Sequence, residues 1–213
     1  MILLSAAKMP AGLDKNALSD TVSLLFPHQD NREYIETIRQ RKNDESACES
    51  LFALALLYEQ IFSLPRRIDT SKLILARSEL GKPYFVNSAL KFNLSHSKGY
   101  VAVACSIGEE LGVDVEASDL SFDRALKMAE RYFTAEEIKK VTACPKAFAK
   151  IWSEKEAKAK FRGESVGNIL SEEQNSDNSD KNGNIRTHSF SIDGFPITLC
   201  TKRDFSTIIF TVQ

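Results

Sequence analysis

The sequence has few residues of the kinds that bind soft metal ions or form disulfides. Its 213 residues include only four cysteines and three histidines, which are widely scattered. They are Cys48, Cys105, Cys144 and Cys200, with His28, His96 and His188. Because there is no C-x-x-C pair and no histidine cluster, the sequence gives no support to a zinc site. The cysteines are instead typical of reduced thiols in a cytoplasmic protein.

Charge of one sign and long apolar runs are lacking too. The 28 basic and 29 acidic residues nearly cancel, so we expect no general attraction to nucleic acid or to an anionic membrane. No stretch approaches the roughly 18 apolar residues that a membrane span needs. The opening MILLSAAKMP has too short an apolar run, and no basic residues before it, for a signal peptide. We therefore expect a cytoplasmic protein without a nucleic-acid or membrane partner.

What is present is the pattern of a globular α+β chain. Hydrophobic residues make up 43% of the sequence and charged residues 27%, as in ordinary folded domains. The first half predicts an opening strand, a helical region from about residue 32 to 62, and four short strands up to residue 107. The second half predicts three helices and then three strands. This order permits two similar lobes that meet near residue 105.

Local composition predicts two of the connections. The residues IGEELG, 107–112, indicate a turn that returns the chain into LGVDVE as a hairpin. The polar residues 171–184 are low in complexity and predict a mobile surface loop.

The stretch LGVDVE, residues 111–116, places two acids on an otherwise apolar strand. Alternate side chains of a strand share a face, so Asp114 and Glu116 would stand side by side with like charge. That arrangement costs free energy unless water, a cation or a proton intervenes. The ordinary interpretation is an edge strand with solvated acids; the functional one is a cation site.

A predicted helix carries FAKIWSEKEAKAKF, in which Phe148, Trp152, Glu156 and Lys160 follow one another at intervals of four along one face. A Glu–Lys pair at this spacing is ordinarily a surface pair worth about 0.3–0.5 kcal/mol. Here, however, Glu156 continues a stripe of aromatic residues that should face the core. A carboxylate that enters a covered site needs a partner, and a metal ion is one.

Two further segments carry polar residues near turns. FNLSHSKGY places Ser95 and His96 where a strand gives way to a turn, and LGKPYF places Lys82 after a glycine. Turn chemistry explains the first and simple exposure the second; alternatively, they offer contacts to an anionic ligand. A Ser–His nucleophile pair is disfavoured, because adjacent strand residues point apart and there is no G-x-S-x-G motif.

Taken together, these segments point to phosphoryl chemistry. Three carboxylates without a cysteine or histidine cluster match a hard ion with oxygen ligands. Mg²⁺ is such an ion, and it commonly borrows phosphate oxygens from its substrate.

The motifs GKPYF, FNLSHS, LGVDVE and WSEKEAKAK, in this order, resemble the 4′-phosphopantetheinyl transferases of the surfactin-synthetase-activating type. The resemblance extends from about residue 81 to 160. It implies an α+β fold of two similar lobes, residues 1–105 and 106–213, related by pseudo-twofold symmetry. Each lobe would pack antiparallel strands on a long helix, and the chain would be a monomer. It also implies transfer of phosphopantetheine from coenzyme A to a serine of an apo acyl or peptidyl carrier protein, with release of 3′,5′-ADP.

The resemblance assigns roles to individual residues. Asp114, Glu116 and Glu156 are implied to bind Mg²⁺, and Lys160 to lie beside the phosphates. Charge then favours Glu156 as the base that takes the proton of the carrier serine, with Lys160 stabilising the charge on the phosphates. Asp114 or Glu116 is the alternative base.

Lys82, Ser95, His96 and Lys160 are the implied contacts to the coenzyme A phosphates. One feature departs from the family, which often has a phosphate-binding arginine in the first long helix. In this sequence Cys48 and Glu49 stand there.

Arg39, Arg41 and Lys42 are the alternatives for that arginine. The segment FRGESVG after Lys160 is a loose version of the family's glycine-containing segment. Two other functions stay open: a noncatalytic relative that binds coenzyme A or a carrier protein, and a Mg²⁺-dependent hydrolase of pyrophosphate bonds.

Overall fold

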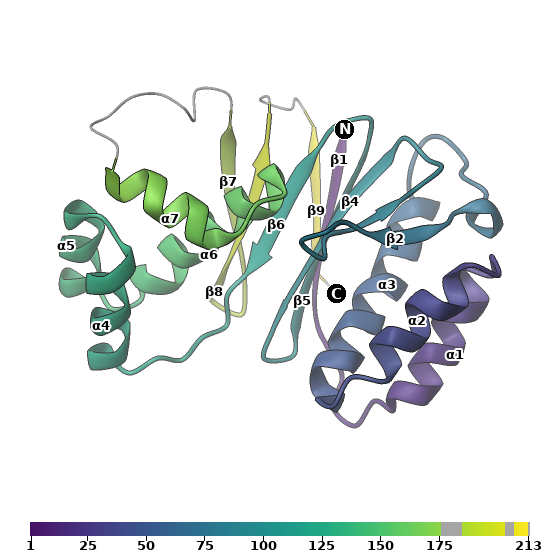
Figure 1. Ribbon diagram of the computed structural model, residues 1–213, viewed down its shortest axis with the longest axis horizontal. Helices are drawn as coiled ribbons and strands as arrows, with labels where there is room; N and C mark the ends of the chain where they lie inside the picture. The colour runs from purple at the N-terminus through teal and green to yellow at the C-terminus, as the bar shows by residue number, and fades with distance from the viewer. Residues whose placement is uncertain (176–184, 203–206, 213) are drawn as a thin grey trace.

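Two sheets lie between two groups of helices in the computed structural model, which describes residues 1–175, 185–202 and 207–212 (Figure 1). The first sheet has the order β4-β5-β1-β9, in which β9 runs parallel to β1 and the other neighbours are antiparallel. Its strands are β1 (Ile2–Lys8), β4 (Leu90–Ser97), β5 (Tyr100–Ile107) and β9 (Ile208–Val212). No helix of the described residues is long and apolar enough to cross a membrane.

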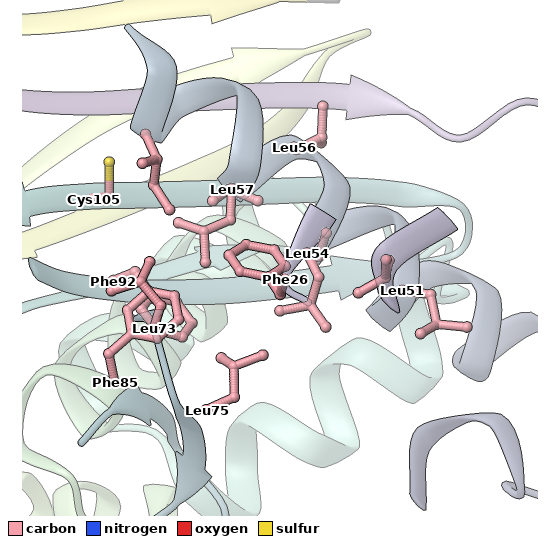
Figure 2. Close-up of a cluster of buried hydrophobic side chains, with 14 of the residues drawn as sticks. Phe26, Leu51, Leu54, Leu56, Leu57, Leu73, Leu75, Phe85, Phe92 and Cys105 are labelled. Carbon is pink, nitrogen blue, oxygen red and sulfur yellow. The ribbon is translucent and has the colours of Figure 1, made fainter. Parts of the chain in front are cut away.

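Three helices lie on the outer side of the first sheet. They are α1 (Lys15–Leu25), α2 (Asn31–Arg39) and α3 (Asp44–Phe62), followed by a 3-10 turn (Thr70–Lys72) and the hairpin β2 (Leu75–Arg77) and β3 (Pro83–Phe85). α3 packs on the strands, and α1 and α2 pack on α3. α3 begins where the side chain of Asn43 accepts a hydrogen bond from the Ser46 amide, which satisfies one free amide of the first turn. Figure 2 shows leucines of α3 gathered around Phe26 in the buried core of this half.

The second sheet has three antiparallel strands in the order β6-β8-β7. They are β6 (Leu111–Val115), β7 (Arg186–Ile192) and β8 (Phe195–Thr201), and their helices are α4 (Phe122–Tyr132), α5 (Ala135–Ala143), α6 (Ala147–Arg162) and α7 (Val166–Asn175). α6 packs on β6 and β8. A capping box of Thr134 and Glu137 starts α5.

The two sheets pack face to face. Along β1, Leu3 and Ala7 belong to the core under α3, whereas Ile2, Leu4 and Ala6 face the second sheet. β1 and β5 are therefore buried on both faces. This double burial explains why β1 and β5 read as continuous apolar runs rather than as alternating patterns.

The backbone of α6 lies directly against β6 at Gly112. A Cβ atom at this position would lie 2.2 Å from the Ala157 carbonyl oxygen and 2.4 Å from the Phe161 amide nitrogen. Only glycine fits so close an approach. The contact sets α6 beside β6, so that Glu156 and Lys160 face the strand that carries Asp114.

The expected hairpin between β5 and β6 is wrong. β6 pairs with β8, because the chain leaves the first sheet after Ile107 and enters the second one. β6 still lies beside β4, where side chains bridge the two strands. The amides of Val113, Val115 and Ala117 donate to Asn93 Oδ1, Ser95 Oγ and Ser97 Oγ at 2.8, 3.2 and 3.1 Å.

The expected loop at residues 171–184 is wrong for its first five residues. Residues 171–175 form the end of helix α7, a helix that the polar composition of this segment does not predict. Glu173 pairs with Lys155 and with Lys158, the latter at 2.9 Å, so acidic residues of this segment serve packing of α7 on α6. Residues 176–184 lie outside the described residues.

Other expectations about the fold are confirmed. The chain mixes helices and strands, and the four short strands between residues 73 and 107 are present. The three expected strands of the second half are present as well, as β7, β8 and β9.

The structure also departs from the expected elements. The helical region expected at residues 32–62 consists of two helices, α2 and α3, and α1 was not expected. β9 joins the first sheet and not the second. A turn at Asp193–Gly194, with φ angles of 50° and 83°, joins β7 to β8. The division into lobes at residue 105 and their pseudo-twofold relation stay predictions.

Candidate functional site

Asp114, Ser95 and Lys160 form the centre of the candidate site. The Lys160 ammonium donates to Asp114 Oδ1 at 2.7 Å and to Ser95 Oγ at 2.9 Å. The Ser95 hydroxyl donates to the same Asp114 oxygen at 2.8 Å. Asp114 is only 5% exposed, and its second oxygen, Oδ2, is buried without a hydrogen-bond partner. A buried carboxylate oxygen without a partner is costly, so this one could accept a further cation.

Burial and the negative charge of Asp114 raise the pKa of two more carboxyl groups, those of Glu116 and Glu156. Burial and then the negative charge of Asp114 raise the pKa of Glu116, against hydrogen bonds from Ser118 and Ser97. Burial also raises the pKa of Glu156; the Lys160 ammonium opposes that shift, and Asp114 and Glu116 add to it. Among the described residues, Asp114, Glu116 and Glu156 therefore share one partly buried region with Lys160, and these three acids outnumber the lysine.

The chemistry of this donor set fits a hard divalent cation, since the ligands are carboxylate oxygens and one of them lacks a partner. As placed, however, no three acidic, histidine or cysteine side chains of the described residues surround one point closely enough to hold a metal ion. The expected metal set of Asp114, Glu116 and Glu156 stays a prediction.

Lys82 lies at the other end of β6. Its ammonium donates to the Leu111 carbonyl at 3.2 Å and lies 3.4 Å from Glu110, which also pairs with Lys91. Burial lowers the pKa of Lys82, and Glu110 opposes that shift. The described contacts of Lys82 are thus with the start of β6 and not with the cluster around Asp114.

His96 points to the opposite side of β4 from Ser95, as the alternation of a strand predicts. Its Nδ1 atom lies 2.7 Å from a carboxylate oxygen of Glu49, and its Nε2 atom lies 3.1 Å from the Ser50 hydroxyl. Both partners belong to α3. The two neighbouring residues of FNLSHS therefore serve different sites, one on each side of β4.

The ring of His96 lines a cationic hollow of about 150 Å³ between α2, α3 and the β2–β3 hairpin. We use "cationic hollow" for the site formed by Arg41, Arg77, Ser50, Tyr34 and His96, which lie among its lining residues. Arg41 donates to Ser50 Oγ at 2.7 Å, and the Arg77 guanidinium lies 4.7 Å from the centre of the Tyr34 ring. No acidic residue is among the described lining residues.

The hollow concentrates positive charge. Burial, and then the neighbouring Arg77 guanidinium, lower the pKa of Arg41. An anion in the hollow would relieve this repulsion. Of the alternatives for the missing helix arginine, Arg41 reaches this place, whereas Arg39 pairs with Glu36 and Lys42 is exposed.

Sequence reasoning missed Arg77 and Lys155. Arg77 reaches the hollow only because the β2–β3 hairpin packs near α2, and no local pattern signals that contact. Lys155, inside the WSEKEAKAK motif, is 1% exposed and pairs with Glu137 at 2.9 Å and with Glu173. Its buried charge joins α5, α6 and α7. The signal was a lysine on the buried face of a helix, which requires an acidic partner.

Part of the chain matches a known family. Residues 110–206 match the model of the 4′-phosphopantetheinyl transferase superfamily. The protein named "Putative 4′-phosphopantetheinyl transferase slr0495" from Synechocystis sp. is 28% identical over 125 residues, which cover 55% of this chain and 48% of that protein. The 4′-phosphopantetheinyl transferase HetI from Nostoc sp. is 31% identical over 102 residues, covering 42% of this chain and 41% of that protein.

A third relative is the L-aminoadipate-semialdehyde dehydrogenase-phosphopantetheinyl transferase of Xenopus laevis, 24% identical over 128 residues, with 53% of this chain and 42% of that protein covered. The chain thus spans about half or less of the length of the curated relatives it matches. Asp114, Glu116, Glu156 and Lys160 all lie within residues 110–206. Residues 110–206, which carry these four side chains, are thus similar to the 4′-phosphopantetheinyl transferase superfamily.

Proposed function

We propose, with this family likeness as the premise, that the chain is a 4′-phosphopantetheinyl transferase of the surfactin-synthetase-activating type. It would transfer 4′-phosphopantetheine from coenzyme A to a serine of an apo acyl or peptidyl carrier protein and release 3′,5′-ADP. The observation that carries the proposal is the contact of Lys160 with Asp114, at 2.7 Å, beside two further acids whose pKa values are raised. Three acids can hold a divalent cation, and that cation together with Lys160 can bind a pyrophosphate.

Asp114, Glu116 and Glu156 would hold Mg²⁺. When bound, Mg²⁺ would supply positive charge to the pyrophosphate oxygens, as it does in phosphoryl transfer generally. The buried oxygen of Asp114 that lacks a partner supports this assignment.

The residues of the chain then orient the reactants and move one proton. The serine oxygen of the carrier bonds to the β-phosphorus of coenzyme A, and the bond from that phosphorus to the departing 3′,5′-ADP oxygen breaks. Glu156 takes the serine proton, and its raised pKa makes it a better base than an ordinary glutamate. Lys160 stabilises the charge that grows on the phosphate oxygens. Asp114 and Glu116 are the alternative bases.

Ser95 and Lys82 would contact the phosphates from β4 and from the loop before β3. Ser95 already accepts a hydrogen bond from Lys160 at 2.9 Å, so an anion bound by Lys160 would lie beside it.

The third phosphate of coenzyme A, the 3′-phosphate, needs a cationic site of its own. We assign it to the cationic hollow, where Arg41 and Arg77 provide charge and His96 provides a ring nitrogen. Arg41 would thereby replace the helix arginine that the family often has. A phosphate monoester suits paired guanidinium groups.

We further propose that the protein is a cytoplasmic monomer. The test of function is incubation with coenzyme A, Mg²⁺ and a panel of apo carrier proteins, followed by mass spectrometry of the intact carriers. We expect a carrier to gain one phosphopantetheine group. Release of a phosphate product without any carrier would favour the pyrophosphate hydrolase, and coenzyme A binding without transfer would favour the noncatalytic relative.

A further inference from the structure

Glu49 occupies an unusual place for an acid. It lies on α3, is 5% exposed, and contacts His96 behind a hollow whose described lining residues are cationic or neutral. Its two carboxylate oxygens have separate tasks. Oε1 accepts a hydrogen bond from the Gly99 amide at 2.6 Å, and Oε2 lies 2.7 Å from His96 Nδ1.

These two bonds explain why Glu49 stays ionised. Burial raises the pKa of Glu49, but the hydrogen bonds from His96 and from the Gly99 amide outweigh burial and hold the pKa below its usual value. A carboxylate at hydrogen-bond distance from Nδ1 requires a proton on that nitrogen. The ring is therefore held by Nδ1, and its Nε2 atom is directed toward Ser50 and the cationic hollow.

The geometry points to Glu49 as a positioning residue for anion binding: its carboxylate holds a proton on His96 Nδ1 and supports the doubly protonated ring, the form in which Nε2 donates to an anion in the cationic hollow. This inference rests on the proposed function, in which that anion is the 3′-phosphate of coenzyme A. It also accounts for an acid where the family often has an arginine. Here the charge comes from Arg41 and Arg77, and Glu49 directs the His96 ring toward the hollow that they line.

The separate tasks of the two oxygens allow a selective substitution. In Glu49→Gln, the amide oxygen can still accept from Gly99 and keep the turn between β4 and β5. The amide nitrogen cannot accept from a protonated His96 Nδ1, so the ring loses the carboxylate that supports its doubly protonated, cationic form. Glu36→Gln is a matched control, because Glu36 also pairs with a cationic side chain, Arg39, but on the outer side of α2.

Binding of 3′,5′-ADP and of ADP should be measured by calorimetry on the full chain, with thermal melts alongside. Loss of a hydrogen bond to a charged group typically costs about tenfold or more in affinity. We expect Glu49→Gln to weaken 3′,5′-ADP binding by about tenfold, to leave ADP binding unchanged, and to melt near the wild-type temperature. Glu36→Gln should resemble the wild type in all three measurements.

A double-mutant cycle decides whether Glu49 acts through His96. If it does, Glu49→Gln should add little to the loss caused by His96→Asn, because the ring it orients is already gone. Additive losses, or equal losses for 3′,5′-ADP and ADP, would overturn the inference in favour of a merely structural role. Should Glu49→Gln not fold, Gly99 and the turn depend on the charge itself, and that result would also overturn it.

Transfer kinetics separate this inference from the proposed function. In an active enzyme, Glu49→Gln should raise the KM for coenzyme A and leave kcat and the KM for 3′-dephospho-coenzyme A unchanged. Suppose that the wild-type protein transfers nothing to any carrier and still binds 3′,5′-ADP more tightly than Glu49→Gln does. That result would refute the proposed function but support the role of Glu49. If instead the wild type and Glu49→Gln transfer with the same KM for coenzyme A, the proposed function stands and the role of Glu49 is refuted.

Discussion

Replacing Gly112 by alanine tests whether the contact between β6 and α6 builds the site. The new methyl carbon would lie 2.2 Å from the Ala157 carbonyl oxygen, whereas such contacts are essentially never shorter than 3.0 Å. The oxygen must therefore retreat by about 0.8 Å. It belongs to a helix backbone, so it cannot rotate away as a side chain could. Either α6 moves as a unit or β6 bends.

The movement should affect both stability and activity. Overpacking of a well-packed interior costs typically about 1–3 kcal/mol. α6 also carries Glu156 and Lys160, and Lys160 lies 2.7 Å from Asp114. A misplacement of about 1 Å can cost about 100-fold in rate. We therefore expect Gly112→Ala to lower the free energy of unfolding by about 1–3 kcal/mol and to lower kcat by about 100-fold.

Chemical denaturation and the carrier-transfer assay measure these two effects. Gly167→Ala is the matched control, because its new methyl group would meet only Ser165 Oγ at 3.7 Å, an ordinary contact. Alanine in a helix is more favourable than glycine by about 0.5–1 kcal/mol, so this control should be as stable as the wild type or more so. If Gly112→Ala were as stable and as active as the wild type, the contact would have no part in forming the site.

Three more outcomes follow from the charges of the second half. Glu156→Gln should lower turnover by about 10²–10⁴-fold without lowering the melting temperature at pH 7. The pKa of Glu156 is raised in the folded state, so above pH 4.5, the ordinary pKa of a glutamate, its ionisation destabilises the fold. The uncharged amide of the variant avoids this cost, so any gain in melting temperature should disappear below that pH. Lys155→Met should cost about 3–5 kcal/mol in denaturant titrations, because Glu137 and Glu173 lose their buried partner, and unchanged stability would show that the network contributes nothing. Chelation of divalent cations should abolish transfer, with recovery on addition of Mg²⁺ or Mn²⁺; full turnover in excess chelator would contradict the assignment of Asp114, Glu116 and Glu156.

Local rules were sufficient for much of the fold. The capping box at Thr134, the turn at Asp193–Gly194 and the strands around Ser95 follow from hydrogen bonds and backbone angles between residues close in sequence. Where a contact joined distant segments, the same rules failed. The β5–β6 hairpin was wrong because pairing of β6 with β8 depends on how two sheets stack, and α7 was missed because its acids serve a buried lysine on α6.

For the candidate site, the sequence alone determined the chemistry of the second half. The spacing of Asp114 and Glu116 puts both acids on one face of a strand, and the spacing of Glu156 and Lys160 puts them on one face of a helix, since these periods are properties of the local backbone. Tertiary structure decided which groups meet. Gly112 permits α6 to lie against β6, so Lys160 reaches Asp114. Arg41 lies between α2 and α3, Arg77 on β2 and His96 on β4, and only the packing of a hairpin and two helices brings these side chains to one hollow.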